Sequence, residues 1–386
     1  RSGIAQVLGR RAQEAAVAIP LLKGALDDPE PAVRADAAQA LAKLADKTLD
    51  PSALQGLVLA LADADVSVRT PAVNGIERLT GRLADPAVDA VFGGAVGDAA
   101  AKALAAALLD EDVGVAGVAA QALGELGPRA AAAVPQLQAA LMSPHSNIAS
   151  DVAKALAKLG PPGIRALLVG VRQGGSPPDG IQLGTIRWAA LSALEDIASP
   201  KAFGAQTDAV VAAIITALAD SRTDVRAEAA NVLGLIGPAA HAAVAPLKNA
   251  LLQLTEDDNE DDIAALAIGL GHLGAQAAPA LLDVLAGGDP AVAAAAAQGL
   301  GQMELGALGA EQNQVVAGLL AAMHRADANV RGAAAMGLGD FGLQKVDLGP
   351  QRARVIAALK AQAAHDADQV AQFQASTALG LLGVNS

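Results

Sequence analysis

One helix-sized pattern recurs about ten times along this chain of 386 residues. Its clearest copy spans residues 220–237 and contains the pair Val225-Arg226. The apolar residues of this copy fall at intervals of three and four, which places them on one face of a helix of about three turns. Thr223 or Asp224 can cap the start of that helix, and a Gly-Pro pair ends it. Because one such helix cannot bury its apolar stripe alone, the recurrence of the pattern decides the architecture.

The copies align on the Val-Arg pair at intervals of about 30 to 47 residues, centred near 38. The aligned pairs are Val33-Arg34, Val68-Arg69, Val115-Ala116, Ile148-Ala149, Ile186-Arg187, Val225-Arg226, Asp262-Ile263, Val292-Ala293, Val330-Arg331 and Ala371-Gln372. Eight positions after the first member of each pair stands Leu41, Ile76, Leu123, Leu156, Leu194, Leu233, Leu270, Leu300, Leu338 or Leu379. All ten residues at this register are apolar, which predicts a shared row of core positions.

A first helix is expected before each of these second helices, for example over residues 15–26 and 210–218. Pro20, Pro135 and Pro279 each lie fourteen residues before the Arg position of their copy. Proline is tolerated in the first turn of a helix, where its missing N–H has no partner within the helix. The common offset indicates that the proline belongs to a repeated helical hairpin.

The order of these residues resembles the consensus of HEAT repeats, especially the bacterial type related to the HEAT-like repeats of phycobilisome lyases. Pro20, Asp28, Val33 and Arg34 occupy the proline, aspartate, valine and arginine positions of that consensus. The resemblance covers nearly the whole chain and implies an all-α fold, a right-handed α-solenoid of about ten antiparallel helix pairs in one domain over residues 1–386. It implies little about function, because HEAT arrays serve many unrelated roles.

An aspartate precedes the arginine of several copies by six residues, and these charges admit two interpretations. The residues are Asp28 and Arg34, Asp63 and Arg69, and Asp220 and Arg226. The aspartate closes the turn of a hairpin and the arginine opens its second helix, so neighbouring repeats can pair them. We therefore interpret them as a structural ladder rather than as a row of functional charges.

The charge and composition of the chain exclude several classes of partner. The formal net charge of −13 opposes binding to nucleic acid or to anionic lipid. Charged or polar residues interrupt every apolar run, so we expect no membrane insertion. The absence of Cys excludes disulfides and thiolate sites, and slightly favours an exported bacterial protein over a cytoplasmic one, leaving the compartment open.

The chain begins without Met in what looks like the tail of a second helix, which suggests processing or truncation at the N-terminus.

No motif of the sequence predicts catalysis. The segments 269–274 and 337–342 match the glycine pattern of dinucleotide-binding loops, but both stand at the end of a predicted helix, where the local dipole is negative. We interpret them as glycines for helix packing and capping. The five histidines are spread over different repeats, where they cannot converge on a metal. We expect no enzyme, no catalytic residue, no metal and no cofactor.

Three segments depart from the repeat, at residues 80–99, 172–185 and 255–262. Insertions of this kind lie at one edge of a solenoid and often carry its binding residues. The acidic third segment alternates possible calcium ligands, but Asp262 stands where an EF-hand needs Gly and Ile268 where it needs Glu, so a solvated loop is favoured over an ion site. The candidate partner-binding residues are Phe92, Arg187, Trp188, Asp257, Asp258 and Glu260.

Two hypotheses of function follow. The favoured one is a non-catalytic scaffold or adaptor, alone or as a subunit of a larger complex, that binds another protein along its concave surface or through the inserted loops. The alternative is an enzyme-associated subunit like those of the phycobilin lyases, although aromatic residues, at 1% of the chain, leave little to stack on a tetrapyrrole. A bound pigment spectrum discriminates between them. DNA handling by repeats of the DNA-glycosylase type is disfavoured by the acidic charge.

Overall fold

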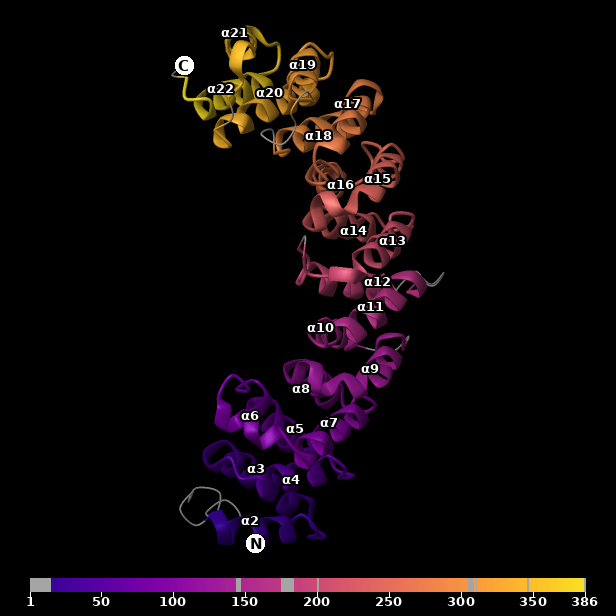
Figure 1. The fold of residues 1–386 in the computed structure, drawn as a ribbon, viewed down its shortest axis with the longest axis vertical. Helices are drawn as coiled ribbons and strands as arrows, with labels where there is room; N and C mark the ends of the chain where they lie inside the picture. The colour runs from indigo at the N-terminus through magenta and orange to yellow at the C-terminus, as the bar shows by residue number, and fades with distance from the viewer. Residues whose placement is uncertain are drawn as a thin grey trace. The chain divides into compact units, whose positions relative to one another are not determined.

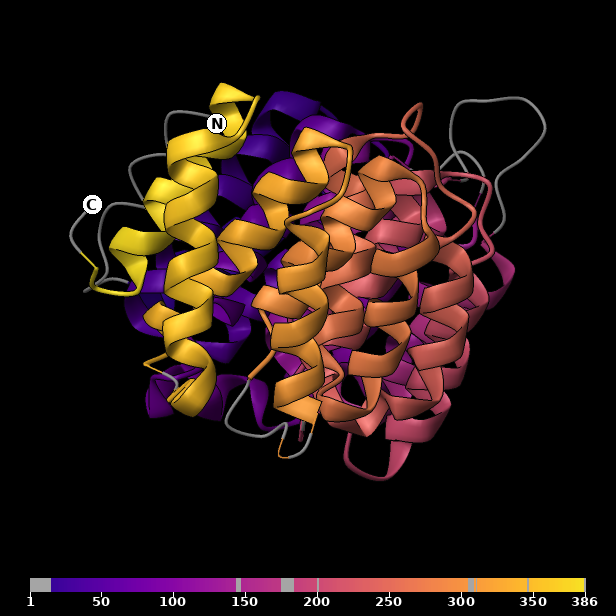
Figure 2. The ribbon, with the colours of Figure 1, turned by 90° about the horizontal axis from the view of Figure 1, so that it is seen from above.

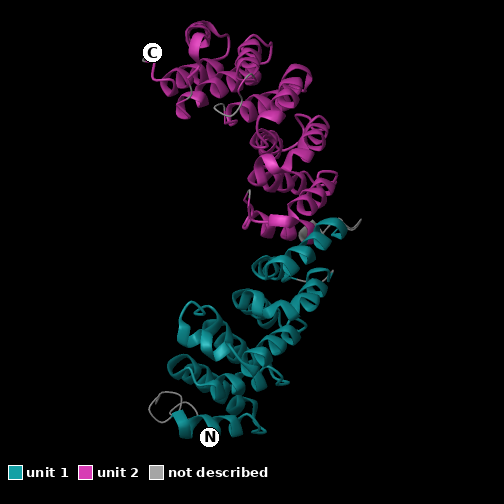
Figure 3. Ribbon diagram, viewed as in Figure 1, with its two compact units in different colours: residues 1–174 teal, residues 175–386 magenta. Residues whose placement is uncertain are grey.

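The computed structural model describes residues 15–143, 147–174, 184–199, 201–304, 309, 311–345 and 347–384. Every regular element in these ranges is helical (Figure 1). The chain divides into two compact units, Arg1–Gly174 and Gly175–Ser386 (Figure 3), here called unit 1 and unit 2. Residues 175–183 of the predicted irregular segment 172–185 lie outside the described ranges.

Unit 1 contains four helical pairs and the first helix of a fifth. The pairs are α2 (Ala15–Ala25) with α3 (Pro31–Thr48), α4 (Pro51–Ala60) with α5 (Val66–Thr80), α7 (Ala95–Ala107) with α8 (Val113–Leu126), and α9 (Val134–Leu141) with α10 (Ala149–Lys158), followed by α11 (Pro161–Gln173). A short additional helix, α6 (Pro86–Phe92), lies in the predicted irregular segment 80–99, so part of that segment is helical. The 3-10 helix η2 (Gly127–Ala133) joins α8 to α9.

Unit 2 begins with the single helix α12 (Gly184–Glu195) and continues with five pairs. These are α13 (Thr207–Ala217) with α14 (Thr223–Ile236), α15 (Val244–Leu251) with α16 (Glu260–His272), α17 (Ala278–Gly287) with α18 (Pro290–Gly301), α19 (Glu311–Ala322) with α20 (Ala328–Leu343), and α21 (Arg352–His365) with α22 (Gln369–Leu381). The second helices α12, α14, α16, α18, α20 and α22 pack on one another in that order. Figure 2 shows the orange and yellow helices at the C-terminal end lying side by side. The predicted all-α solenoid is confirmed.

The ten-membered apolar row forms the centre of the core. Leu41, Ile76, Leu123, Leu156, Leu194, Leu233, Leu270, Leu300, Leu338 and Leu379 are each at most 2% exposed. Each lies on a second helix of its unit. Burial of a leucine side chain contributes roughly 1.5–3 kcal/mol, so this row supplies a similar increment to every repeat.

Glycines set the distance between consecutive second helices in unit 2. A Cβ atom on Gly269 of α16 would lie 2.5 Å from the carbonyl oxygen of Ala230 in α14, and one on Gly299 of α18 would lie 2.4 Å from that of Ala267. Gly269 belongs to the first glycine motif of the sequence and lies within α16. Helix packing, as predicted, is therefore the role of that glycine.

The start of α14 differs from the prediction. Its N-cap residue is Arg222, which makes no side-chain capping bond, so neither Thr223 nor Asp224 is the cap. Asp224 instead accepts hydrogen bonds from Arg222 and from the N–H of Val225. The second helices α5, α8, α16, α18, α20 and α22 do begin with an Asp or Asn whose side chain caps the first turn.

One described stretch, Thr223–Leu251, is long and apolar enough to cross a membrane by length and composition. It comprises α14, the 3-10 helix η4 (Gly237–Ala243) and α15. Half of its most apolar window is buried within the protein, and Val225 and Leu233 are wholly buried there. Core helices of soluble proteins pass the same test, so this stretch gives only weak support for a membrane span.

Candidate functional site

Arginines of the second helices bind aspartates of the following repeat in both units. In unit 1, Arg34 Nε donates to Asp63 Oδ2 at 2.7 Å and its Nη2 donates to Oδ1 at 2.9 Å. Arg69 Nε and Nη2 donate to the two carboxylate oxygens of Asp110 in the same bidentate geometry, at 2.6 and 2.8 Å. In unit 2, Arg331 Nε and Nη2 reach Asp366 at 2.8 and 2.6 Å. Such bidentate, charge-assisted bonds are stronger and more directional than neutral ones.

The six-residue spacing has a second geometric consequence within each repeat. The Nη1 atom of Arg34, Arg69 and Arg226 donates to the backbone carbonyl of the residue six positions earlier, at 2.9, 2.9 and 2.8 Å. These carbonyls belong to the turn that joins the two helices of a hairpin. Each arginine therefore connects its own turn to the carboxylate of the next repeat, a geometry consistent with the proposed ladder.

The hydrogen bond from Arg34 holds the pKa of the Asp63 carboxyl below its usual value, and Arg331 does the same for Asp366. A lowered pKa in the folded state adds stability above the unfolded value of about 3.8, and this stability is lost as the pH falls through the folded pKa. The pairs are therefore expected to weaken only in acid.

The arginine is absent from five of the described second helices, among them α22, where Gln372 takes its place. Ala116 and Ala149 take its place in α8 and α10, and Ile263 and Ala293 take its place in α16 and α18. Near the last of these, Arg325 from the following repeat donates to the carbonyl oxygens of Leu285 and Ala286, both at 2.9 Å. A guanidinium from the next repeat thus binds the C-terminal carbonyls of α17.

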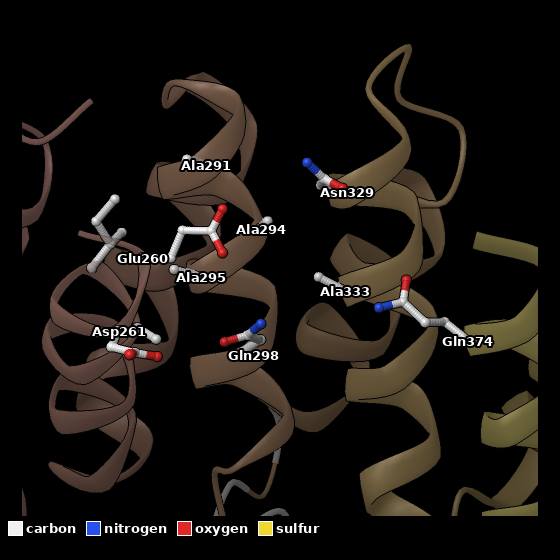
Figure 4. A pocket seen from close by; sticks show the side chains of 11 residues that line it. Glu260, Asp261, Ala291, Ala294, Ala295, Gln298, Asn329, Ala333 and Gln374 are labelled. Atoms are coloured by element: carbon white, nitrogen blue, oxygen red, sulfur yellow. The ribbon is translucent and has the colours of Figure 1, made fainter. Parts of the chain in front are cut away.

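A recess of about 300 Å³ lies over these arginine-free helices of unit 2. Its residues come from α16, α18 and α20 and from one position of α22; they are Glu260, Asp261, Ile263, Ala264, Ala291, Ala294, Ala295, Gln298, Asn329, Ala333 and Gln374. Figure 4 shows the polar side chains standing around alanines. Because the alanine side chains are short, they leave the space between neighbouring helices unfilled.

The recess presents two kinds of polar group around its apolar floor. Glu260 and Asp261 contribute carboxylates, and among the residues that the structure describes neither carboxylate has a hydrogen-bond or ion-pair partner. Gln298, Asn329 and Gln374 contribute amides, which can donate and accept. No group of three or more His, Asp or Glu residues in the described ranges is placed to hold a metal ion.

A family model described as HEAT repeats matches residues 1–77, 100–179 and 279–380. These segments cover about two thirds of the chain. The chain belongs to the HEAT-repeat family. No curated protein shows a significant match to the sequence.

Solved structures of karyopherins share this HEAT-repeat fold. Kap121p aligns with a TM-score of 0.59 and 13% identity over 95% of this chain and 41% of its own. Kap95p, in a structure with RanGDP, gives 0.54 and 15% over 98% of this chain and 52% of its own. The karyopherin Kap121p bound to the extreme C-terminus of the protein phosphatase Cdc14p gives 0.59 and 16% over 96% and 42%. This chain spans about half or less of these structures, and the likeness concerns the fold alone.

Three of the six candidate partner-binding residues are engaged inside the HEAT array. Phe92 is 4% exposed in α6, so its ring is part of the core and the prediction of a surface contact is corrected. Arg187 forms an ion pair with Asp220 of the next repeat and its side chain is 13% exposed. Asp258 accepts from the N–H of Thr255 at 3.0 Å and lies 3.8 Å from Arg226. The two charged residues therefore occupy ladder positions.

The other three candidates lie at the surface of unit 2. Trp188 of α12 is 37% exposed, and Asp257 and Glu260 are exposed. Of these, Glu260 lines the recess and Asp257 belongs to the loop of residues 252–259 that precedes α16. The acidic segment 255–262 thus ends inside the helix, whose N-cap Asn259 accepts from Asp261 and Asp262.

The recess is not predicted by the sequence motifs, and of its lining residues only Glu260 is among the candidate partner contacts. Two signals could have found it. The 76 residues from 249 to 324 contain ten Asp or Glu and no Lys or Arg, whereas the other 310 contain thirty acidic and twenty-seven basic residues. The arginine is also absent from two consecutive repeats, at Ile263 and Ala293. Both signals lie in one segment of the chain.

A second acidic feature of unit 2 is a pair of half-buried glutamates, Glu195 of α12 and Glu228 of α14. Burial raises the pKa of Glu228 to about 7, and the neighbouring carboxylate of Glu195 adds to the shift. The Oε1 atom of Glu228 is buried without a hydrogen-bond partner among the described residues. Holding this carboxylate charged is therefore unfavourable in the folded state.

We expect the stability of unit 2 to depend on pH through Glu228. The folded protein keeps the proton up to about pH 7, while the unfolded chain loses it near 4.5, so the free energy of unfolding should fall as the pH rises through this window. Glu228→Gln should remove this slope and raise the melting temperature at pH 8. Melting curves from pH 4 to 8 measure it, with Glu260→Gln as an exposed control. If the melting temperature of Glu228→Gln depended on pH as that of the wild type does, another titratable group would be responsible for the dependence.

Proposed function

We propose that this HEAT-repeat chain is a non-catalytic scaffold that binds another protein over the recess of unit 2. The observation that supports this is an unfilled alanine floor on packed second helices, rimmed by carboxylates and amides without a nucleophile or histidine beside them. Rigid helices present such a surface with little loss of conformational freedom on binding. The structural neighbour Kap121p, which binds a peptide terminus of a phosphatase, illustrates protein binding by a similar solenoid.

Filling the recess should abolish partner binding without unfolding the repeats. Ala294 lines the recess and is partly exposed, so Ala294→Tyr should occupy the space that a partner needs. The measurement is affinity capture from native extract with mass spectrometry, repeated with each variant. Ala321→Tyr, at an exposed position of the first helix α19, is the matched control. Proteins retained equally by wild type and both variants would contradict binding at the recess.

The described residues give no support to the phycobilin-lyase-like alternative. None of the residues that line the recess is aromatic, so no ring is present there to stack on a tetrapyrrole. A pigment absorption band that co-purifies with the protein would overturn this preference.

A further inference from the structure

The recess is the centre of an acidic region without its own cations. Eight of its eleven lining residues belong to the 76-residue segment that has ten acidic and no basic residues. In repeats that carry the ladder arginine, a guanidinium stands near the start of the second helix. In α16 and α18 that position is Ile263 or Ala293, both buried, so the carboxylates of Glu260 and Asp261 have no such neighbour.

The arginines that border this region are already bound elsewhere. Arg226 donates to the carbonyls of Asp220 and Ser221 and pairs with Asp258, which does not line the recess, and Arg331 is paired with Asp366. Arg325 donates to two carbonyls at the end of α17. The carboxylates of Glu260 and Asp261 are therefore left for a partner to neutralise, and opposite charge steers association and fixes register.

The shape of the recess selects among positively charged partners. An isolated divalent cation needs several converging oxygen ligands, and no suitable group exists in the described residues. The floor is lined by alanine side chains, with the carboxylates of Glu260 and Asp261 at one rim, the amides of Asn329 and Gln374 at the other, and Gln298 between them (Figure 4). A lysine or arginine side chain matches both parts, since its aliphatic stem packs on apolar surface while its charged end remains near the rim. At about 300 Å³ the recess lies at the lower end of the range for ligand pockets, about 300–1,000 Å³.

We propose that the recess docks an extended basic segment of a partner protein. One lysine or arginine of that segment lies over Ala294 and Ala295, with its charged group at Glu260 and Asp261. The amides of Gln298, Asn329 and Gln374 bind the peptide backbone beside it, because amide groups can both donate to its carbonyls and accept from its N–H groups. This inference rests on the proposed function and adds the chemistry of the partner.

The direct test uses a labelled peptide of alternating Lys and Gly, with the same peptide carrying Glu in place of Lys as the negative probe. Fluorescence anisotropy should show binding of the Lys peptide alone, weakening as salt is raised. In the double variant Glu260→Gln/Asp261→Asn we expect the Kd to rise about tenfold. The matched control Glu256→Gln/Asp257→Asn removes two charges from the same acidic segment outside the recess, and should change Kd less than about twofold.

Each outcome separates the inference from the proposed function. Equal weakening by the two double variants would show attraction by net charge and would overturn docking at the recess. If Ala294→Tyr abolishes capture of the native partner while the Lys peptide fails to bind the wild type, the proposed scaffold function stands. The inference that the partner docks through a basic segment is then contradicted. If Ala294→Tyr changes neither capture nor peptide binding, both proposals fail. Circular dichroism melting of every variant establishes that the helices are intact.

Discussion

Arg69→Ala should lower the free energy of unfolding by about 1.5–3 kcal/mol, the usual contribution of hydrogen bonds to charged groups. The substitution removes two bonds to Asp110 and two to backbone carbonyls of the preceding turn, and leaves a carboxylate whose side chain is 6% exposed without its cation. Urea unfolding followed by circular dichroism measures the loss. Because stability in a repeat array is largely a sum of neighbour terms, hydrogen exchange should show it first in α5 and α8.

Arg226→Ala is the comparison that assigns the origin of this loss. Arg226 makes the same bond to the carbonyl six residues earlier, at 2.8 Å, but lies 3.8 Å from Asp258. If the bidentate pair between repeats carries the stabilisation, Arg226→Ala should be less destabilising than Arg69→Ala. Equal losses would attribute the effect to the carbonyl bonds. A double-mutant cycle of Arg69→Ala with Asp110→Ala isolates the pair itself, and a coupling energy near zero would contradict a stabilising ladder.

The repeating part of the fold could be predicted because its physical requirement is the same in every copy. A helix that must bury one face against two neighbours needs an apolar residue such as Leu233 at a fixed register, and alignment of ten copies makes that register visible. The close contact at Gly269 follows from the same regularity. Helix periodicity does not determine which residue is the N-cap of a helix. The prediction therefore placed the N-cap of α14 at Thr223 or Asp224, whereas the structure has Arg222 there.

The candidate site was harder to predict because departures from a repeat have several physical causes. The Phe-Gly-Gly of segment 80–99 suggested an exposed loop, but the chain forms α6 there and buries Phe92. Arg187 lies next to the only Trp of the sequence, and this neighbour suggested a partner interface. Its register in the repeat is that of a ladder arginine, however, and Arg187 forms an ion pair with Asp220. The recess arises where short alanine side chains leave space between helices that also lack the arginine, at positions 263 and 293. A search for chemically conspicuous side chains does not detect such an absence.

Gly269→Ala should destabilise unit 2 although alanine is the better helix former. The added Cβ would lie 2.5 Å from the carbonyl oxygen of Ala230 and 2.9 Å from its carbon, so α14 and α16 would have to separate. Overpacking of this kind costs about 1–3 kcal/mol, which exceeds the gain of up to about 1 kcal/mol in helix propensity. Since α16 carries Glu260 and Asp261, the separation should also displace one rim of the recess.

The matched control is Gly380→Ala in α22, where an added Cβ meets no atom within 4 Å. With no steric cost, this variant should keep or slightly raise the melting temperature, while Gly269→Ala lowers it. Opposite signs for the same chemical change would show that contact between neighbouring second helices, and not helix propensity, requires glycine at position 269. A stabilised Gly269→Ala variant would show that the helices can shift without cost. The spacing of α14 and α16 would then not be set by glycine, and the rim of the recess would be adjustable rather than fixed.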